Sequence, residues 1–74
     1  MPGIKIEDLE DIFTYHPPDD EQKVRYEKIR TGAKEFAKIL LENTPGSADQ
    51  TAAIRKLREC VHTANGSVAL RGKF

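Results

Sequence analysis

Two short breaks divide this chain into three stretches, and they limit its possible folds more than any other feature. One break is Pro17-Pro18 and the other is the turn Thr44-Pro45-Gly46. Proline lacks a backbone N–H and disfavours a helical residue before it, so each break ends a helix. Apolar residues recur at helical spacing between the breaks. The sequence therefore predicts an all-α fold with helices over residues 6–13, 20–43 and 47–69.

The first predicted helix is short and has one apolar stripe, formed by Ile6, Leu9, Ile12 and Phe13. A helix of this length is unstable alone in water, so we expect it to dock on another surface. The link between the second and third helices is short, which makes these two helices antiparallel neighbours. The predicted architecture is a short N-terminal helix followed by an antiparallel two-helix hairpin.

Both long helices have recognisable N-terminal caps. Asp19 immediately precedes the second helix, and Gln22 comes three residues after Asp19. This pair predicts a capping box. Ser47 and Gln50 have the same spacing at the start of the third helix and predict a second box. Such caps satisfy backbone N–H groups that have no partner within the helix.

The long helices each have an apolar face. In the second helix this face is formed by Tyr26, Ile29, Ala33, Phe36, Ala37 and Leu40. In the third helix it is formed by Ala53, Ile54, Leu57, Val61, Ala64 and Val68. Val24, Ile39 and Leu41 widen the stripe of the second helix beyond the width that one neighbouring helix covers. The excess indicates apolar surface for a partner subunit.

The small size of the chain also favours assembly. With 74 residues the sequence allows one domain, over residues 1–74, whose core is small. Chains of this size gain stability from disulfides, metals or partner subunits. Cys60 is the only cysteine, and His16 and His62 lack metal-ligand spacing, so we expect no disulfide, metal or cofactor. A homo-oligomer remains as the expected state.

Charge and hydropathy exclude two kinds of partner. The chain has 12 basic and 12 acidic side chains, whereas a general DNA or RNA binder needs an excess of cations. A small anion held by one or two arginines is compatible with this balance. No apolar run reaches the length of a membrane span, so we expect no membrane partner. The acidic N-terminal segment lacks the pattern of a signal peptide, which predicts a cytoplasmic protein.

The sequence also offers little catalytic chemistry. Cys60 lies beside the apolar position Val61, and we interpret it as a buried structural thiol rather than a nucleophile. His62 is two residues away and points in a different direction on a helix. The glycines are scattered and form no phosphate-binding loop. We therefore predict that the protein is not an enzyme.

The segment Phe13-Thr14-Tyr15-His16-Pro17-Pro18 permits two interpretations. In the first, Phe13 belongs to the core, Tyr15 packs half-buried and the prolines only end a helix. In the second, Tyr15 offers a flat face on which a nucleobase stacks. Arg30, on the following helix, would then pair with a phosphate. In the alternative interpretation, Arg30 is an ordinary surface arginine.

The same residues carry a resemblance to a known family. The string FTYHPP at 13–18 is followed without gaps by RYE-x-IR and AKEFA in the second helix. These strings resemble the phage anti-CBASS cyclic-nucleotide sponge family, a hairpin-domain family, and the likeness continues in the third helix at Ala53-Ile54, Leu57-Arg58, Val61 and Ala64-Asn65. The likeness extends over residues 13–69. It departs from the family pattern at Cys60, His62 and Gly66-Ser67.

The resemblance implies a non-enzymatic inhibitor that works in the cytoplasm of the infected bacterial host. Members of the family are homohexamers, built as trimers of dimers, which sequester cyclic dinucleotides such as cyclic GMP-AMP. Some also hold cyclic trinucleotides in a separate pocket. By position in the family pattern, Tyr15 and Arg30 would bind the cyclic dinucleotide, and Arg71 would serve the trinucleotide pocket.

Two other functions remain as alternatives at this point. A small helical adaptor or regulator would bind another protein through the same apolar stripe, and Tyr15 would then be purely structural. A phosphodiesterase would destroy the messenger, but it needs a metal site or general base that the sequence does not offer.

Overall fold

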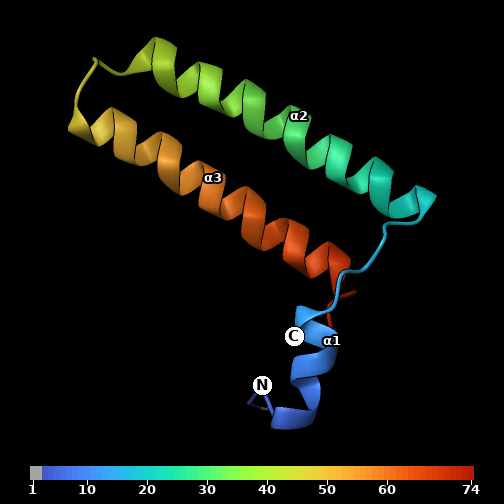
Figure 1. Cartoon of the computed structure of the whole chain (residues 1–74). Coiled ribbons are helices and arrows are strands. Elements are labelled where there is room, and N and C mark those ends of the chain that lie inside the picture. Colours follow the sequence, from blue (N-terminus) through green and yellow to red (C-terminus); the bar gives the residue numbers. More distant parts are fainter. Residues whose placement is uncertain (1–2) are drawn as a thin grey trace.

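The computed structural model describes residues 3–74, and all of its regular structure is helical (Figure 1). A 3₁₀ turn, η1 (Ile6–Asp8), leads into α1 (Leu9–Phe13). The two long helices are α2 (Asp20–Asn43) and α3 (Ala48–Ala69). The all-helical prediction is confirmed for the described residues. The first helix differs from expectation in its 3₁₀ opening turn. Residues 1 and 2, which the predicted domain includes, lie outside the described residues.

The predicted capping box at the start of α2 is present. The Asp19 carboxylate accepts a hydrogen bond from the Gln22 backbone N–H at 2.8 Å. The Gln22 side-chain oxygen accepts one from the Asp19 backbone N–H at 3.0 Å. Two N–H groups at the helix start are thus satisfied reciprocally, which explains why α2 begins at Asp20.

At the start of α3 only half of the predicted box forms. Ser47 Oγ accepts from the Gln50 backbone N–H at 3.1 Å, as expected. The Gln50 side-chain amide, however, donates to the carbonyl and hydroxyl oxygens of Thr44, at 3.0 and 3.1 Å. The prediction of the return bond to Ser47 was wrong, because the end of α2 offers Gln50 two nearby acceptors. The bond instead connects the end of α2 to the start of α3.

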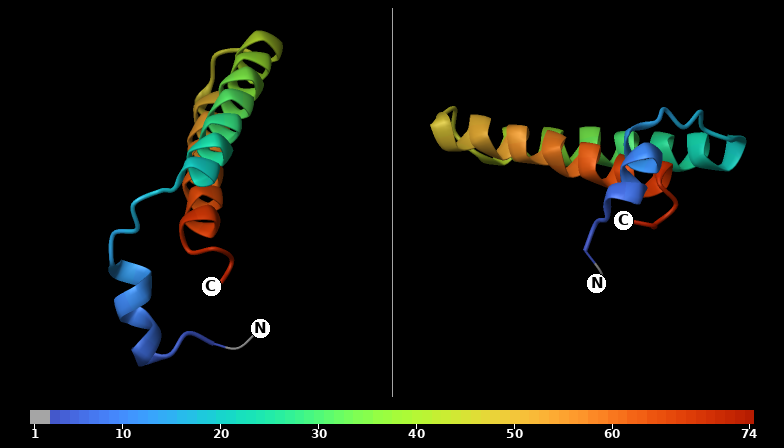
Figure 2. Two further views of the ribbon diagram at one scale, coloured as in Figure 1. Left: turned by 90° about the vertical axis from the view of Figure 1, so that its right-hand side faces the viewer. Right: turned by 60° about the horizontal axis from the view of Figure 1, so that its bottom comes forward.

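Helices α2 and α3 pack side by side in antiparallel orientation (Figures 1 and 2). Their facing side chains are only partly covered, and Gln22 is the one buried residue among those described. Phe36, which belongs to the apolar stripe predicted for α2, is 50% exposed. Cys60, interpreted as a buried thiol, is also exposed, so that interpretation was wrong for a single chain. A two-helix hairpin has no third layer to cover residues at the edge of its apolar stripe.

Helix α1 packs against neither α2 nor α3 and projects from the open end of the hairpin (Figure 2). Its contact with the rest of the chain is polar, since Lys73 Nζ lies 3.2 Å from an Asp11 carboxylate oxygen. Its apolar stripe is open to solvent: Ile6 is 85% and Phe13 is 81% exposed. The predicted docking of this helix does not occur within one chain, and Phe13 is not a core residue.

Candidate functional site

Tyr15 lies in the linker between α1 and α2, and 79% of it is exposed to solvent. The extended backbone at Thr14 and the two prolines that follow keep this segment out of a helix. The interpretation of Tyr15 as a half-buried packing residue is therefore wrong for the single chain. Most of the Tyr15 side chain is therefore open to a binding partner.

Arg30 lies at the edge of a groove between α2 and α3. This interhelix groove has a volume of about 200 Å³. It is lined by Arg30, Ala33, Lys34 and Ala37 of α2, and by Ile54, Leu57, Arg58, Val61 and His62 of α3. The surface inside the groove is almost wholly apolar, so its charged or titratable residues line it mainly with their carbon atoms. No ion pair engages the guanidinium of Arg30 among the described residues.

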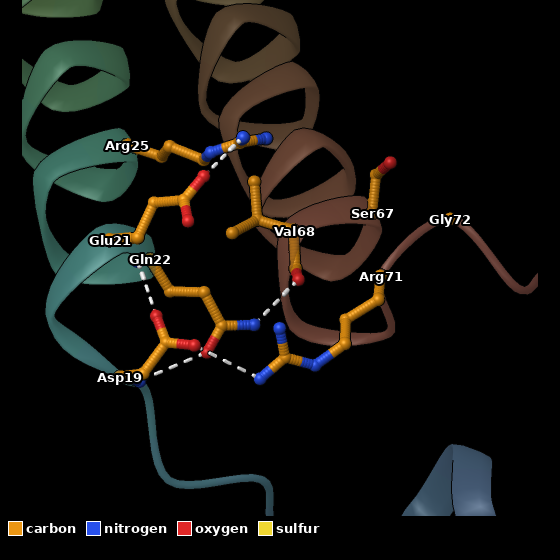
Figure 3. Close-up of a pocket in the computed structure, with 8 residues that line it drawn as sticks. All are labelled: Asp19, Glu21, Gln22, Arg25, Ser67, Val68, Arg71 and Gly72. Carbon is orange, nitrogen blue, oxygen red and sulfur yellow. Dashed lines mark hydrogen bonds and ion pairs between the residues drawn. The ribbon is translucent and has the colours of Figure 1, made fainter.

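Arg71 lies in a larger hollow, where the start of α2 meets the end of α3 (Figure 3). This junction hollow has a volume of about 410 Å³. It is lined by Asp19, Glu21, Gln22, Arg25, Ser67, Val68, Arg71 and Gly72. The buried Gln22 side chain crosses it and donates to the carbonyl oxygen of Val68 at 3.0 Å. That bond joins the two helices at their open end.

The backbone at the end of α3 determines where Arg71 points. The Gly72 N–H donates to the Ser67 carbonyl at 3.0 Å, and the Arg71 N–H donates to the Val68 carbonyl at 3.2 Å. These two bonds form a Schellman motif, in which the position of Arg71 is usually a glycine. Arg71 accordingly has a φ of 55°, in the left-handed region. Its guanidinium donates to the Asp19 carboxylate at 3.1 Å.

The environment of Asp19 favours its ionised form. The hydrogen bond from the Gln22 backbone N–H lowers the pKa of this carboxyl, and the bond from the Arg71 guanidinium lowers it further. Asp19 therefore caps α2 and holds Arg71 through the same charged group. A phosphate that binds Arg71 must compete with this carboxylate.

We expect the stability of the fold to depend on Asp19 ionisation. Because the pKa in the folded protein lies below the usual 3.8, ionised Asp19 stabilises the fold above that value. This stabilisation disappears as the pH falls through the folded pKa. Asp19→Asn retains a capping oxygen but carries no charge. Thermal unfolding from about pH 7 to about pH 2 should show the variant less stable at neutral pH, with a difference that vanishes in acid. A difference independent of pH would contradict this assignment.

The three predicted ligand-binding residues do not share one site within a single chain. Arg30 lies ten residues beyond Asp20, which places it about 15 Å along α2 from the helix start. Tyr15 precedes that start, and Arg71 lies in the junction hollow at the same end. Neither the interhelix groove nor the junction hollow contains both Tyr15 and Arg30.

Other residues line the groove beside Arg30, although the sequence did not identify them as ligand-binding residues. Arg58 and His62 of α3 and Lys34 of α2 line the same groove as Arg30. Arg58 and His62 lie one turn apart, immediately beside apolar positions of α3, and this adjacency is a sequence signal that could have placed them beside Arg30. Gln22 was selected only as a capping residue, not as the bridge to α3.

Among residues 3–74, no three or more His, Cys, Asp or Glu side chains gather where they could hold a metal ion. No helix in the same part is long and apolar enough to cross a membrane.

The fold and its hollows define a small helical-hairpin protein with cationic side chains at its open end and along its interhelix groove. A family model described as "Acb2/Tad1, hairpin domain" matches residues 5–69, and the chain belongs to this family. The resemblance found in the sequence is thereby confirmed. No curated protein and no solved structure matches the chain. Tyr15 and Arg30 lie within the matched region, and Arg71 lies two residues beyond it.

Proposed function

We propose that this protein captures cyclic oligonucleotide messengers of bacterial CBASS immunity and holds them without cleavage. The observation that carries the proposal is the match to the Acb2/Tad1 hairpin domain over residues 5–69, which includes Tyr15 and Arg30. The protein would act in the cytoplasm of an infected bacterium. The messenger would be withheld from its effector, and no chemical step would be needed.

The chemistry of Tyr15 and Arg30 suits such a ligand. A cyclic dinucleotide has two bases and two phosphates, so a two-fold interface with paired Tyr15 and Arg30 side chains matches its symmetry. The exposed ring of Tyr15 supports a stacking role. The guanidinium of Arg30, which forms no ion pair within residues 3–74, supports a phosphate-binding role, because a planar fork fits two phosphate oxygens.

A homo-oligomer is part of the proposal, with the hexamer of the family, a trimer of dimers, as its expected form. The described residues include no buried apolar side chain. Large apolar groups are exposed instead on η1, α1 and α2. They are Ile6, Leu9, Phe13, Val24, Phe36, Ile39 and Leu41. Covering them with identical subunits would provide the core that one hairpin lacks.

Release of the bound ligand by heat tests the proposed function. The purified protein is mixed with cyclic GMP-AMP, separated from free ligand, and then denatured by heat. We expect chromatography of the supernatant to recover intact cyclic GMP-AMP. Linear products would indicate a phosphodiesterase, and the absence of any bound ligand across a panel of cyclic di- and trinucleotides would favour an adaptor. Either result would overturn the proposal.

Substitution of Arg71 tests whether trinucleotides use a separate pocket. We expect Arg71→Ala to weaken cyclic trinucleotide binding by about tenfold or more, as for one lost hydrogen bond between charged groups. Cyclic dinucleotide binding should not change, because Arg30 lies elsewhere on the hairpin. Calorimetric titrations with both ligand classes measure the two affinities. Equal losses for both would contradict the two-pocket arrangement.

A further inference from the structure

The interhelix groove carries more positive charge than one arginine supplies. Arg30 and Lys34 line it from α2, and Arg58 and His62 line it from α3. The members of each pair are four residues apart, so both project from the same face of their helix. No carboxylate lines this groove. Cationic or titratable side chains therefore line the groove from both helices.

No ion pair among residues 3–74 engages Arg30, Lys34, Arg58 or His62. The ion pairs of the described residues use the carboxylates of Asp11, Asp19 and Glu21, which lie at or before the first turn of α2. Glu59 lines an adjoining hollow, of about 180 Å³, that also includes Arg58, but it forms no ion pair there. A chain with zero net charge thus keeps like charges together along one groove. Such charges repel one another, and a bound anion removes that repulsion.

The floor of the groove favours an anion with a flat apolar part. Ala33 and Ala37 of α2 and Leu57 of α3 contribute to this floor. A nucleotide has both properties, since its phosphate can reach the rim while its base covers aliphatic carbon. The volume of about 200 Å³ is smaller than that of pockets that enclose a complete ligand, which are about 300–1,000 Å³. One groove therefore accommodates part of a cyclic dinucleotide, and a second copy would cover the rest.

We infer that Arg58 is a second phosphate-binding residue, which acts from α3 while Arg30 acts from α2. This inference rests on the proposed function and extends it to a residue on the other helix. Arg58 is the one arginine of α3 that lines the groove, and the planar fork at the end of its side chain can pair with two oxygens of a phosphodiester. Lys34 and His62 add positive or titratable groups beside the two arginines, with less geometric selectivity.

Calorimetric titration of cyclic GMP-AMP into four proteins tests this inference: the wild type, Arg30→Gln, Arg58→Gln and Lys56→Gln. Lys56 is an exposed cation on α3 that lies outside the groove, so it controls for the loss of one positive charge. We expect Arg58→Gln to lower the affinity about tenfold, as for a lost charge-assisted hydrogen bond. Lys56→Gln should bind as the wild type does. The affinity of Arg58→Gln should also fall less steeply with added salt than that of the wild type.

The outcomes separate this inference from the proposed function. If Arg30→Gln loses affinity while Arg58→Gln matches Lys56→Gln, Arg58 is not a ligand residue, yet the proposed function stands. If the wild type binds no cyclic nucleotide, both fail at the first titration. Arg58→Lys provides a variant that keeps the charge and the helical propensity in case Arg58→Gln does not fold. An affinity for Arg58→Lys between wild type and Arg58→Gln supports the role of the fork, and wild-type affinity in both variants overturns it.

Discussion

Replacing Tyr15 with alanine is expected to weaken the binding of cyclic dinucleotides strongly. Stacking on an aromatic ring contributes about 1–3 kcal/mol per base, so a site with two Tyr15 rings would lose about 2–6 kcal/mol. The affinity should therefore fall by at least about 30-fold. Calorimetric titration with cyclic GMP-AMP measures this loss. Because Tyr15 is 79% exposed, the fold of the single chain should be unaffected.

Tyr15→Phe is the matched control, since it keeps the ring and removes only the hydroxyl. We expect this variant to bind nearly as well as the wild type. Sedimentation velocity should give the same assembly for the wild type and both variants. If Tyr15→Ala dissociated the assembly, the residue would have a structural role and the binding loss would say nothing about stacking. Wild-type affinity in Tyr15→Ala would contradict the prediction directly.

Placing a carboxylate at Phe36 is expected to dissociate the assembly. Phe36 is a large apolar residue of α2, and half of it is exposed in the single chain. If a second copy covers it, Phe36→Asp would bury an unpaired charge, which costs several kcal/mol. An interface of this kind would then separate at micromolar concentration. Sedimentation velocity should show the 8.3 kDa monomer in place of the wild-type assembly.

Two variants control for side effects of the Phe36 substitution. Thr51→Asp introduces the same change of charge at an exposed position of α3, and it should leave the assembly intact. Phe36→Leu keeps an apolar side chain and should assemble with reduced affinity. An intact assembly in Phe36→Asp would show that this part of α2 stays open to solvent, and the subunit contact would have to lie elsewhere.

Local sequence signals were sufficient to predict where the two long helices lie, because helix caps and breaks depend on only a few neighbouring residues. Asp19 and Gln22 satisfy each other's backbone N–H groups, and this requires only their spacing of three. Gln50 has the same spacing from Ser47 but bonds to Thr44 instead. Its choice depends on how the chain turns between α2 and α3, which no local pattern specifies.

The burial of individual side chains and the residues of the interhelix groove could not be predicted, because both depend on how the helices pack in three dimensions. Phe36 belongs to the apolar stripe by periodicity, but a single neighbouring helix covers only part of that stripe. Cys60 was interpreted from its neighbour Val61, although consecutive residues point about 100° apart on a helix. Arg58 could not be placed opposite Arg30, because that pairing depends on how α2 and α3 are rotated against each other.

The left-handed backbone at Arg71 has a consequence for thermal stability. A residue with a β-carbon is strained at a φ of 55°, by about 1–2 kcal/mol, whereas glycine is not. Exposed ion pairs such as that between Arg71 and Asp19 offset little of this strain. Arg71→Gly should therefore melt at a higher temperature than Arg71→Ala, although both lack the guanidinium. The chain therefore tolerates a strained backbone at Arg71, and in return a charged side chain lines the junction hollow.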